Sequence, residues 1–379
     1  MIQRGDVHCY LTSSKFRGRI GTLTFFEGGI SMRTYVKIVC LLCIILIVGF
    51  AAFAGKPKEK VEGKGLVFYL SPNQFDEFQT TASKLIRKYV EEAGYELREM
   101  VAQSGQAEDV ALQLSQLDDA ITQDPEAIII AACDSSAVVD GIERARQKGI
   151  PVIVFDRTIQ ETEVDFSSVA GCKRIGILAG GEIARLLKEK YGTVKGTILD
   201  IMGDPGDMYT VLIEEGFQEV MAEYPGVKIT TKIADGWEAS NAADIADNWL
   251  VAYPETDLIF SHAEHLAAAI TSVLQTQGYE KGEIIMVSTA GMPMGLDLVR
   301  DGWLQSTVEQ PLTAQAEGVA MFMGDVIKGK EIKPGTYTVG GFESDLTIKP
   351  YGPELMIPGS VITKANVDDK KFWGNQVSE

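Results

Sequence analysis

An acidic and a basic side chain stand next to each other directly after a short apolar run of the sequence. The run covers residues 152–155, and the pair is Asp156 and Arg157. A carboxylate offers several acceptor sites and a guanidinium offers a rigid fork of five donors, so together they can satisfy adjacent hydroxyl groups and a ring oxygen of a ligand. The alternative is a salt bridge in a loop, which contributes little when it is exposed. Because an apolar strand precedes the pair, we favour the ligand role.

The stretch 261–265 contains two of the three histidines of the chain, His262 and His265, with Glu264 between them. Imidazole and carboxylate are common zinc ligands and common catalytic bases. The stretch lacks a third, distant histidine and the helical i, i+4 spacing of a zinc motif, so we predict no metal site here. We expect ligand contact or a structural role, and an enzyme that uses His262 or His265 as its base is an alternative. No phosphate-binding or dinucleotide-binding motif occurs, so no cofactor is expected.

Short apolar runs alternate with amphipathic helical stretches from about residue 65 onward. Strands are predicted over 66–70, 97–102, 127–132 and 152–155, and again over 196–201, 227–233, 258–260, 284–287 and 304–308. Continuous apolar runs are typical of parallel strands that helices cover on both faces. The sequence therefore predicts an α/β fold of two similar doubly wound parallel-sheet lobes in series.

The two series of elements define the expected lobes. We assign 65–172 plus 311–335 to an N-terminal lobe, 173–310 plus 336–367 to a C-terminal lobe, and 368–379 to a tail. The chain would then cross between the lobes three times, in a hinge. Ligands of open parallel sheets bind beyond the carboxyl ends of the strands, and the boundary between two lobes is a natural cleft. The loops that follow the strands are therefore the candidate site.

The charge balance excludes some classes of protein. Against 35 lysines and arginines the chain has 53 aspartates and glutamates, a formal net charge of −18. A nucleic-acid binder or a polybasic membrane-surface protein needs a positive face, so neither is expected. Five cysteines in 379 residues exclude a disulfide scaffold. Whether Cys133 and Cys172 pair with each other stays open.

The N-terminal region has the layout of an export signal. Arg33 and Lys37 precede an apolar run over 38–54, which ends in a small-x-small cleavage pattern. An uncleaved membrane anchor is the alternative, since the run is at the short limit of a spanning helix. We therefore assign 1–31 to an extension from a misassigned start, 32–54 to a signal peptide and 55–64 to a linker.

Several loops and strand ends carry a family resemblance. They are 71–75 (SPNQF), 133–137 (CDSSA), 151–157 (PVIVFDR), 215–218 (EGFQ), Trp237, Gln310 before a proline, and 362–367 (ITKANV). With these residues the chain resembles the ribose-type periplasmic sugar-binding proteins, the solute-binding components of ABC importers. The resemblance extends from about residue 65 to 367 and implies the type I periplasmic binding protein fold.

The resemblance also implies roles for single residues. Asp156 and Arg157 would grip the sugar, while Phe75 and Trp237, one from each lobe, would sandwich its apolar face. Asn73 and Gln310 would add side chains that both donate and accept. The loops after two further strands add Asp134 and Glu264 to the expected ligand contacts.

Departures from the ribose pattern bear on the ligand. Positions where ribose binders carry polar side chains are Ala131, Val211, Ala263 and Ala290 in this chain. Because losing a buried hydrogen-bonding group changes selectivity by orders of magnitude, we expect a different sugar, a polyol or a glycoside instead of ribose.

The function that the resemblance implies is capture of a carbohydrate or polyol by closure of two lobes, without chemistry, and delivery to ABC permease subunits. We expect a periplasmic monomer that does not bind nucleic acid. A ligand-binding sensor for a chemoreceptor or histidine kinase is the alternative. On this hypothesis Arg157→Ala would lose ligand affinity and keep the fold.

Overall fold

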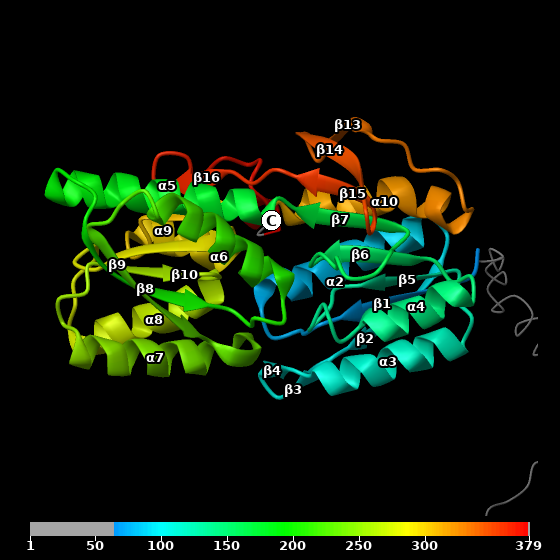
Figure 1. Ribbon diagram of the computed structural model, residues 1–379, viewed down its shortest axis with the longest axis horizontal. Helices are drawn as coiled ribbons and strands as arrows, with labels where there is room; N and C mark the ends of the chain where they lie inside the picture. Colours follow the sequence, from blue (N-terminus) through cyan, green and yellow to red (C-terminus); the bar gives the residue numbers. More distant parts are fainter. Residues whose placement is uncertain (1–63, 378–379) are drawn as a thin grey trace, which may run out of the picture. The chain divides into compact units, whose positions relative to one another are not determined.

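The computed structural model describes residues 64–377 of the protein. They form two α/β lobes, each built around its own sheet (Figure 1). The predicted extension, signal peptide and nearly all of the predicted linker lie outside the described residues. Within residues 64–377, no helix has the length and apolar character that crossing a membrane would require.

The N-terminal lobe contains an eight-stranded sheet in the order β13-β14-β15-β7-β6-β5-β1-β2. The six strands from β15 to β2 are parallel, whereas β13 and β14 are joined antiparallel. A separate small pair, β3 (Gln103–Ser104) and β4 (Ala107–Glu108), follows β2. The strands of the main sheet are β1 (Leu66–Ser71), β2 (Glu96–Val101), β5 (Ala127–Ile130), β6 (Val152–Asp156), β7 (Phe166–Ala170), β13 (Gly335–Val339), β14 (Phe342–Lys349) and β15 (Gly352–Ile357).

The C-terminal lobe contains a six-stranded sheet in the order β16-β12-β11-β10-β8-β9, parallel except at β16. Its strands are β8 (Gly196–Met202), β9 (Val227–Ile233), β10 (Leu258–Ser261), β11 (Ile285–Ala290), β12 (Ser306–Glu309) and β16 (Val361–Thr363). The prediction of an α/β fold with two parallel-sheet lobes is confirmed.

Helices cover the sheets of both lobes. In the N-terminal lobe they are α2 (Glu77–Glu92), α3 (Val110–Thr122), α4 (Val139–Gln147) and α10 (Leu312–Ile327). In the C-terminal lobe they are α5 (Cys172–Tyr191), α6 (Met208–Met221), η1 (Asp235–Trp237), α7 (Ala239–Ala252), α8 (Glu264–Gln277), α9 (Pro293–Asp301) and α11 (Trp373–Gln376). The chain passes between the lobes after β7, after β12 and after β15.

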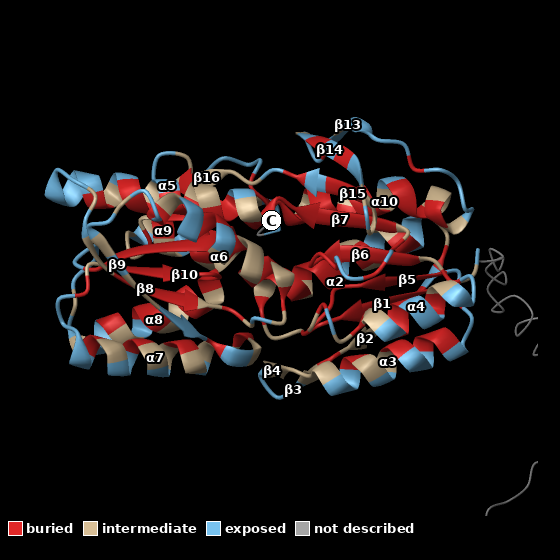
Figure 2. Ribbon diagram, in the orientation of Figure 1, coloured by how far each residue is buried: buried red, intermediate tan, exposed pale blue. Residues whose placement is uncertain are grey.

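The central strands are buried on both faces, which explains why they read as continuous apolar runs. In β1, Val67 and Tyr69 face a core that includes residues of α2, whereas Phe68 and Leu70 face a second core with residues of α3. Figure 2 shows the same distribution, with buried sheets and helices whose outer sides are exposed.

One predicted lobe boundary is wrong. Residues 336–367 were assigned to the C-terminal lobe, but β13, β14 and β15 extend the sheet of the N-terminal lobe, and β16 alone joins the other sheet. β13 is mostly exposed and β14 alternates exposed and buried residues, so both lack the apolar runs on which the prediction relied. β7 was also missed, because two serines interrupt its apolar character. The predicted tail packs against the C-terminal lobe at Trp373, which is buried and donates its indole N–H to the Ala290 carbonyl oxygen at 2.8 Å.

Helices α5 and α6 approach each other at two glycines. A Cβ added to Gly176 would lie 2.0 Å from the carbonyl oxygen of Ile213, and one added to Gly216 would lie 2.1 Å from that of Lys173. The backbone therefore leaves no room for a side chain at either position.

We expect Gly176→Ala to lower the free energy of unfolding by about 1–3 kcal/mol, because the two helices must move apart. Gly181 lies on the same helix, exposed and with no atom within 4 Å of an added Cβ. Gly181→Ala should instead leave stability unchanged or raise it by up to about 1 kcal/mol, through the better helix propensity of alanine. Urea denaturation of both variants checks this, and equal effects would contradict the close approach.

Candidate functional site

A pocket lies between the two lobes, beyond the carboxyl end of β6. Its volume is about 30 Å³, enough for a water molecule or two, since a cavity needs about 10–15 Å³ to hold one. Both lobes contribute side chains, so the pocket exists only when the lobes are together. The lining residues are Asp76, Phe78, Gln79, Asp156, Arg157, Asp207, Tyr209, Trp237, Ala263, His265, Ala290, Met292 and Gln310.

Asp156 ends β6 with a φ of 70°, a backbone region in which aspartate and asparagine are tolerated better than most residues. One carboxylate oxygen accepts a hydrogen bond from Gln79 Nε2 at 2.8 Å and the other accepts one from Gln310 Nε2. Burial raises the pKa of Asp156 to about 6, against the opposing charge of Arg157 and the two hydrogen bonds. The carboxylate is therefore held in place by amide groups from two further segments of the chain.

Arg157 makes ion pairs with carboxylates of both lobes. Its two Nη atoms donate to the two oxygens of Glu108, each at 2.7 Å, and Nη1 also donates to the Ala132 carbonyl at 2.9 Å. Its Nε lies 2.8 Å from Oδ2 of Asp207, which precedes α6 in the C-terminal lobe. Burial raises the pKa of Asp207 to about 8, and Arg157 opposes that rise. The guanidinium thus joins the two lobes at the floor of the pocket.

Aromatic side chains form the apolar part of the pocket. The Trp237 ring lies 6.1 Å from the ring of Tyr209 and 6.1 Å from the imidazole of His265, measured between centroids. Phe78 comes from the N-terminal lobe, and its outer edge packs against Trp373 in a T-shaped contact. Flat apolar faces from both lobes therefore border the charged floor.

Four of the predicted site residues line this pocket: Asp156, Arg157, Trp237 and Gln310. Asn73 and Phe75 do not. Asn73 is buried and donates to Glu108 at 2.7 Å, so it supports the partner of Arg157. Phe75 is half-buried and packs against the hydrophobic core, and Phe78, three residues later in the first turn of α2, takes the place in the pocket that was expected for Phe75.

Asp134 and Glu264 also lie outside the residues that line the pocket. Asp134 accepts hydrogen bonds from the backbone N–H groups of Ser136 and Ala137, at 2.9 and 2.8 Å, and so forms the turn before α4. Glu264 is fully buried and accepts a hydrogen bond from the Gly291 N–H at 2.6 Å. Both carboxylates organise loops near the pocket, because short acidic side chains bond readily to nearby backbone donors.

Several pocket residues were missed by the sequence analysis. Gln79 is one of them. Asp76 caps α2 by accepting a hydrogen bond from the Gln79 N–H at 2.7 Å, and the Asp-x-x-Gln spacing could have indicated that the helix begins here. Asp207 caps α6 in a similar manner. Glu108 had no signal in the sequence, since it lies on the short strand β4 and reaches Arg157 only through the tertiary fold.

The two cysteines of the described region are free and buried. Cys133 Sγ lies 3.9 Å from the Pro72 carbonyl oxygen, and Cys172 Sγ lies 3.4 Å from that of Ala170. Burial raises the pKa of both thiols, which makes them poor nucleophiles.

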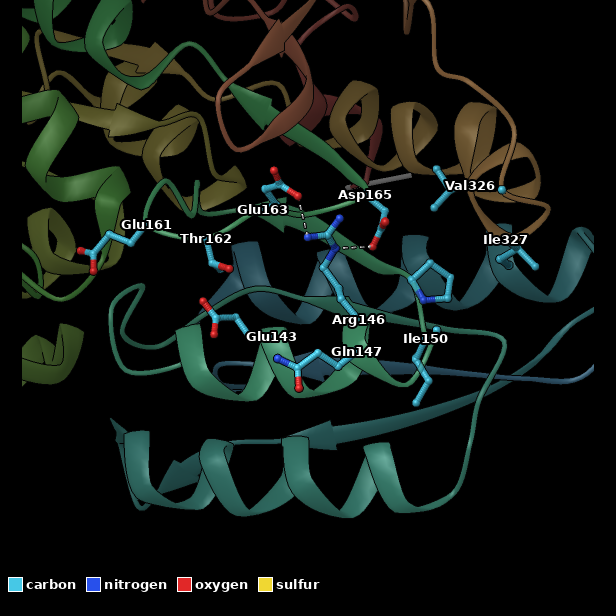
Figure 3. A pocket seen from close by; sticks show the side chains of 13 residues that line it. Glu143, Arg146, Gln147, Ile150, Glu161, Thr162, Glu163, Asp165, Val326 and Ile327 are labelled. Atoms are coloured by element: carbon cyan, nitrogen blue, oxygen red, sulfur yellow. Dashed lines mark hydrogen bonds and ion pairs between the residues drawn. The ribbon is translucent and has the colours of Figure 1, made fainter.

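A larger hollow of about 710 Å³ lies on the N-terminal lobe (Figure 3). Its side chains include Arg146, paired with Glu163 and Asp165 at 3.1 and 3.4 Å. It lies at the amino ends of β6 and β7, opposite the edge at which ligands of parallel sheets bind. Despite its size, we therefore take the pocket between the lobes as the candidate site.

Comparison with known proteins agrees with this geometry. The model of the periplasmic binding protein domain matches residues 67–331. The ribose import binding protein RbsB of Salmonella typhimurium is 27% identical over 248 residues, which are 65% of this chain and 79% of that protein.

Two solved structures share the fold. One is a carbohydrate transporter solute-binding protein of Agrobacterium radiobacter in complex with D-arabinose, with a TM-score of 0.71, 19% identity and coverage of 81% of this chain and 97% of that one. The other is an ABC transporter solute-binding protein of Bacillus halodurans C-125 with bound myo-inositol, with a TM-score of 0.69, 21% identity and coverage of 82% and 98%.

Proposed function

The chain belongs to the periplasmic binding protein domain family, and from this premise we propose that it captures a small sugar or polyol between its lobes and delivers it to the membrane subunits of an ABC importer. The observation that carries the proposal is the pocket between the lobes, in which Asp156 and Arg157 at the end of β6 meet Asp207, Tyr209 and Trp237 of the other lobe. The similarity to RbsB supports the ligand class.

Ligand entry requires the lobes to separate. A pocket of about 30 Å³ is too small for a sugar, and the ion pair between Arg157 and Asp207 closes it. Opening about the three crossings would break this contact and expose the floor of the pocket. Closure around a ligand then presents one defined surface to the permease.

The polar groups of the pocket favour a ligand with hydroxyl donors. Gln79 Nε2 donates to Asp156, which leaves its Oε1 as a buried acceptor without a partner among the described residues. His265 Nε2 lies 3.1 Å from the Trp237 carbonyl oxygen, which can only accept, so the neutral imidazole keeps its lone pair on Nδ1. That nitrogen also lacks a partner within residues 64–377. The indole N–H of Trp237 is a buried donor that likewise has no hydrogen-bond partner among the described residues.

The second lobe contributes little polar contact at the positions of Ala263 and Ala290, which both line the pocket. We therefore propose a ligand with an apolar side or a short polyol chain facing these alanines and Met292. Ribose, with hydroxyl groups around its ring, is not expected to be the preferred ligand.

A thermal-shift and calorimetry panel of pentoses, hexoses, polyols and glycosides tests this proposal, together with mass spectrometry of any ligand that co-purifies. We expect at least one neutral member to raise the melting temperature by several degrees, as saturation at 100 times the dissociation constant adds about 2.7 kcal/mol. Ribose as the strongest ligand would overturn the specificity, and no binding by any member would overturn the function.

We propose a periplasmic location, action as a monomer, and no catalysis by His265. Light scattering tests the monomer, and recovery of the ligand unchanged after incubation tests the last point. Chemical turnover that disappears in His265→Ala would favour the enzyme alternative instead.

A further inference from the structure

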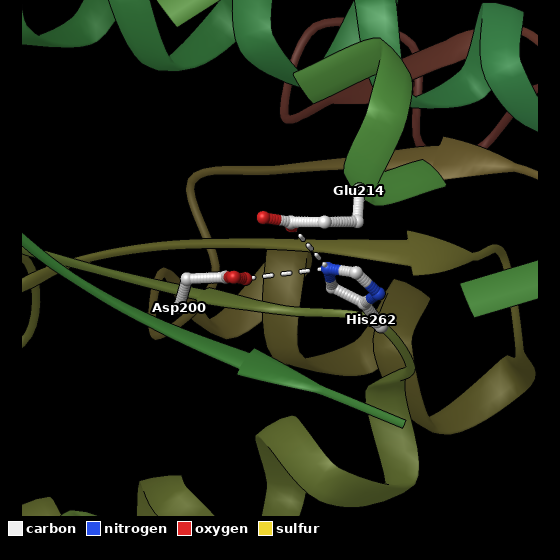
Figure 4. A group of neighbouring side chains, drawn as sticks. All are labelled: Asp200, Glu214 and His262. Carbon is white, nitrogen blue, oxygen red and sulfur yellow. Dashed lines mark ion pairs between the residues drawn. The ribbon is translucent and has the colours of Figure 1, made fainter. Parts of the chain in front are cut away.

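A buried polar cluster lies inside the C-terminal lobe, apart from the residues that line the pocket. It consists of Asp200 on β8, Glu214 on α6 and His262 directly after β10 (Figure 4). Nε2 of His262 lies 3.2 Å from Oδ1 of Asp200 and 3.7 Å from Oε2 of Glu214. The three side chains come from separate elements and converge on one point.

Asp200 is in an unusual environment for a carboxylate. It is fully buried, and within residues 64–377 its oxygens have no polar neighbour that compensates their charge beyond the Glu214 carboxyl group and the His262 imidazole. Oε2 of Glu214 and Nε2 of His262 are also buried without a hydrogen-bond partner there. An unsatisfied buried carboxylate is costly, and such a group in a native fold requires an explanation such as a bound ion.

The nearby residues do not supply the missing positive charge. In the described part of the chain, no lysine or arginine lies within ion-pair distance of Asp200 or Glu214, and His262 is their one ion-pair partner. Gln218 donates to Oε1 of Glu214 at 2.7 Å, which fixes this side chain and leaves Oε2 directed at the cluster. A divalent cation would neutralise both carboxylates beside a neutral imidazole.

The distances between the candidate ligand atoms fit a metal. Bonds of about 2.0–2.2 Å in a tetrahedral arrangement place neighbouring ligand atoms about 3.3–3.6 Å apart. The separations of 3.2 and 3.7 Å from Nε2 of His262 lie close to this range, and all three ligand atoms lie within 4.8 Å of one another. One imidazole and two carboxylates are a donor set for zinc and similar transition ions, whereas calcium prefers six to eight oxygens.

The surroundings of His262 also suit a ligand. Nδ1 lies 3.0 Å from the hydroxyl oxygen of Thr210, which can accept the Nδ1 hydrogen and so present the Nε2 lone pair to a metal. Thr210 accepts in turn from the Gly203 N–H at 2.9 Å. The Glu214 side chain is 18% exposed, which gives an ion a route to the cluster from solvent.

We propose that Asp200, Glu214 and His262 form a binding site for one divalent transition-metal ion of the zinc type, which joins β8, α6 and β10. Thr210 lies in the first turn of α6, next to Tyr209 and close to the N-cap residue Asp207, so the ion would also stabilise the wall of the ligand pocket. The site is independent of the proposed function, because none of its three residues lines the pocket.

The test is a zinc titration of the purified protein after treatment with a chelator and dialysis into metal-free buffer at pH 7.5. We expect one zinc ion bound per chain by elemental analysis, and an increase of several degrees in melting temperature. Cobalt(II) at the same stoichiometry should give the visible absorption bands of a low-coordinate site.

Glu214→Gln and His262→Gln should each weaken zinc binding at least tenfold. Glu215→Gln is the matched control on the same helix, since Glu215 is exposed and pairs with Lys173, and it should change the affinity less than twofold. Circular dichroism shows whether each variant folds, and the two ligand variants are independent tests. No zinc binding, or binding that neither ligand variant weakens, overturns the proposal and leaves protons as the neutralising charge.

Discussion

Replacing Arg157 with alanine is expected to lower the free energy of unfolding by about 3–5 kcal/mol, because it leaves buried carboxylates without their partner. Glu108 loses two hydrogen bonds of 2.7 Å and Asp207 loses an ion pair of 2.8 Å. Asp156 loses a more distant positive charge at 3.7 Å. This loss is a large part of the stability of a typical domain.

The sequence alone predicts a different result, in which Arg157→Ala loses ligand affinity and leaves the stability of the fold unchanged. Arg157→Ala should still lose ligand affinity, but with a weakened fold and easier separation of the lobes. Urea denaturation at pH 7 measures the first effect and calorimetry the second. Arg146→Ala is the control, because this arginine pairs with half-exposed acidic side chains in the same lobe, and it should cost less than about 1 kcal/mol. Equal stability of the two variants would contradict the role of Arg157 in joining the lobes.

The fold could be predicted from the sequence where helices cover a sheet on both faces. Runs such as 127–132 and 152–155 are apolar throughout because no side of the strand meets water. The same criterion failed at β14 (Phe342–Lys349), whose residues alternate between exposed and buried, and at β7, where serines are buried. The error in the lobe boundary follows from this, since β13, β14 and β15 extend the sheet of the N-terminal lobe although they follow most of the C-terminal lobe in the sequence.

The site could be predicted only to the extent that strand ends determine it. Asp156 ends β6, and Arg157 and Gln310 directly follow β6 and β12. Parallel strands bring their carboxyl ends to one edge of the sheet. Glu108 and Asp207 could not be paired with Arg157 in this manner, since one lies on a short strand outside the main sheet and the other caps a helix of the opposite lobe. Asn73 and Glu264 have suitable side chains at suitable places, but their hydrogen bonds are made within the protein.

The unfolding free energy of the ligand-free protein is expected to fall as the pH rises from 4 to 7, and Asp156 should account for about 2–2.5 kcal/mol of the change. Its pKa is about 6 in the folded protein, compared with an ordinary value of 3.8, chiefly because it is buried. Between these two values the folded state holds a proton that the unfolded state has released, so each increase in pH favours unfolding. The full difference between the two pKa values corresponds to about 3 kcal/mol, of which about 2–2.5 kcal/mol falls between pH 4 and pH 7. Denaturation midpoints between pH 4 and pH 7.5 measure the slope.

Asp156→Asn isolates this contribution, because Glu264 and Glu309 also have raised pKa values, about 8 and about 7, and change stability in the same direction. Asparagine tolerates the φ of 70° at this position. Rotation of the Gln79 amide would turn its unpartnered Oε1 toward the new Nδ2 donor. The variant should therefore fold, and its stability should fall less steeply with pH than that of the wild type. Asp134→Asn, which changes a turn outside the pocket, should keep the full slope. A slope that Asp156→Asn leaves unchanged would show that Asp156 is ionised in the folded protein throughout this range, with Arg157 outweighing the cost of burial.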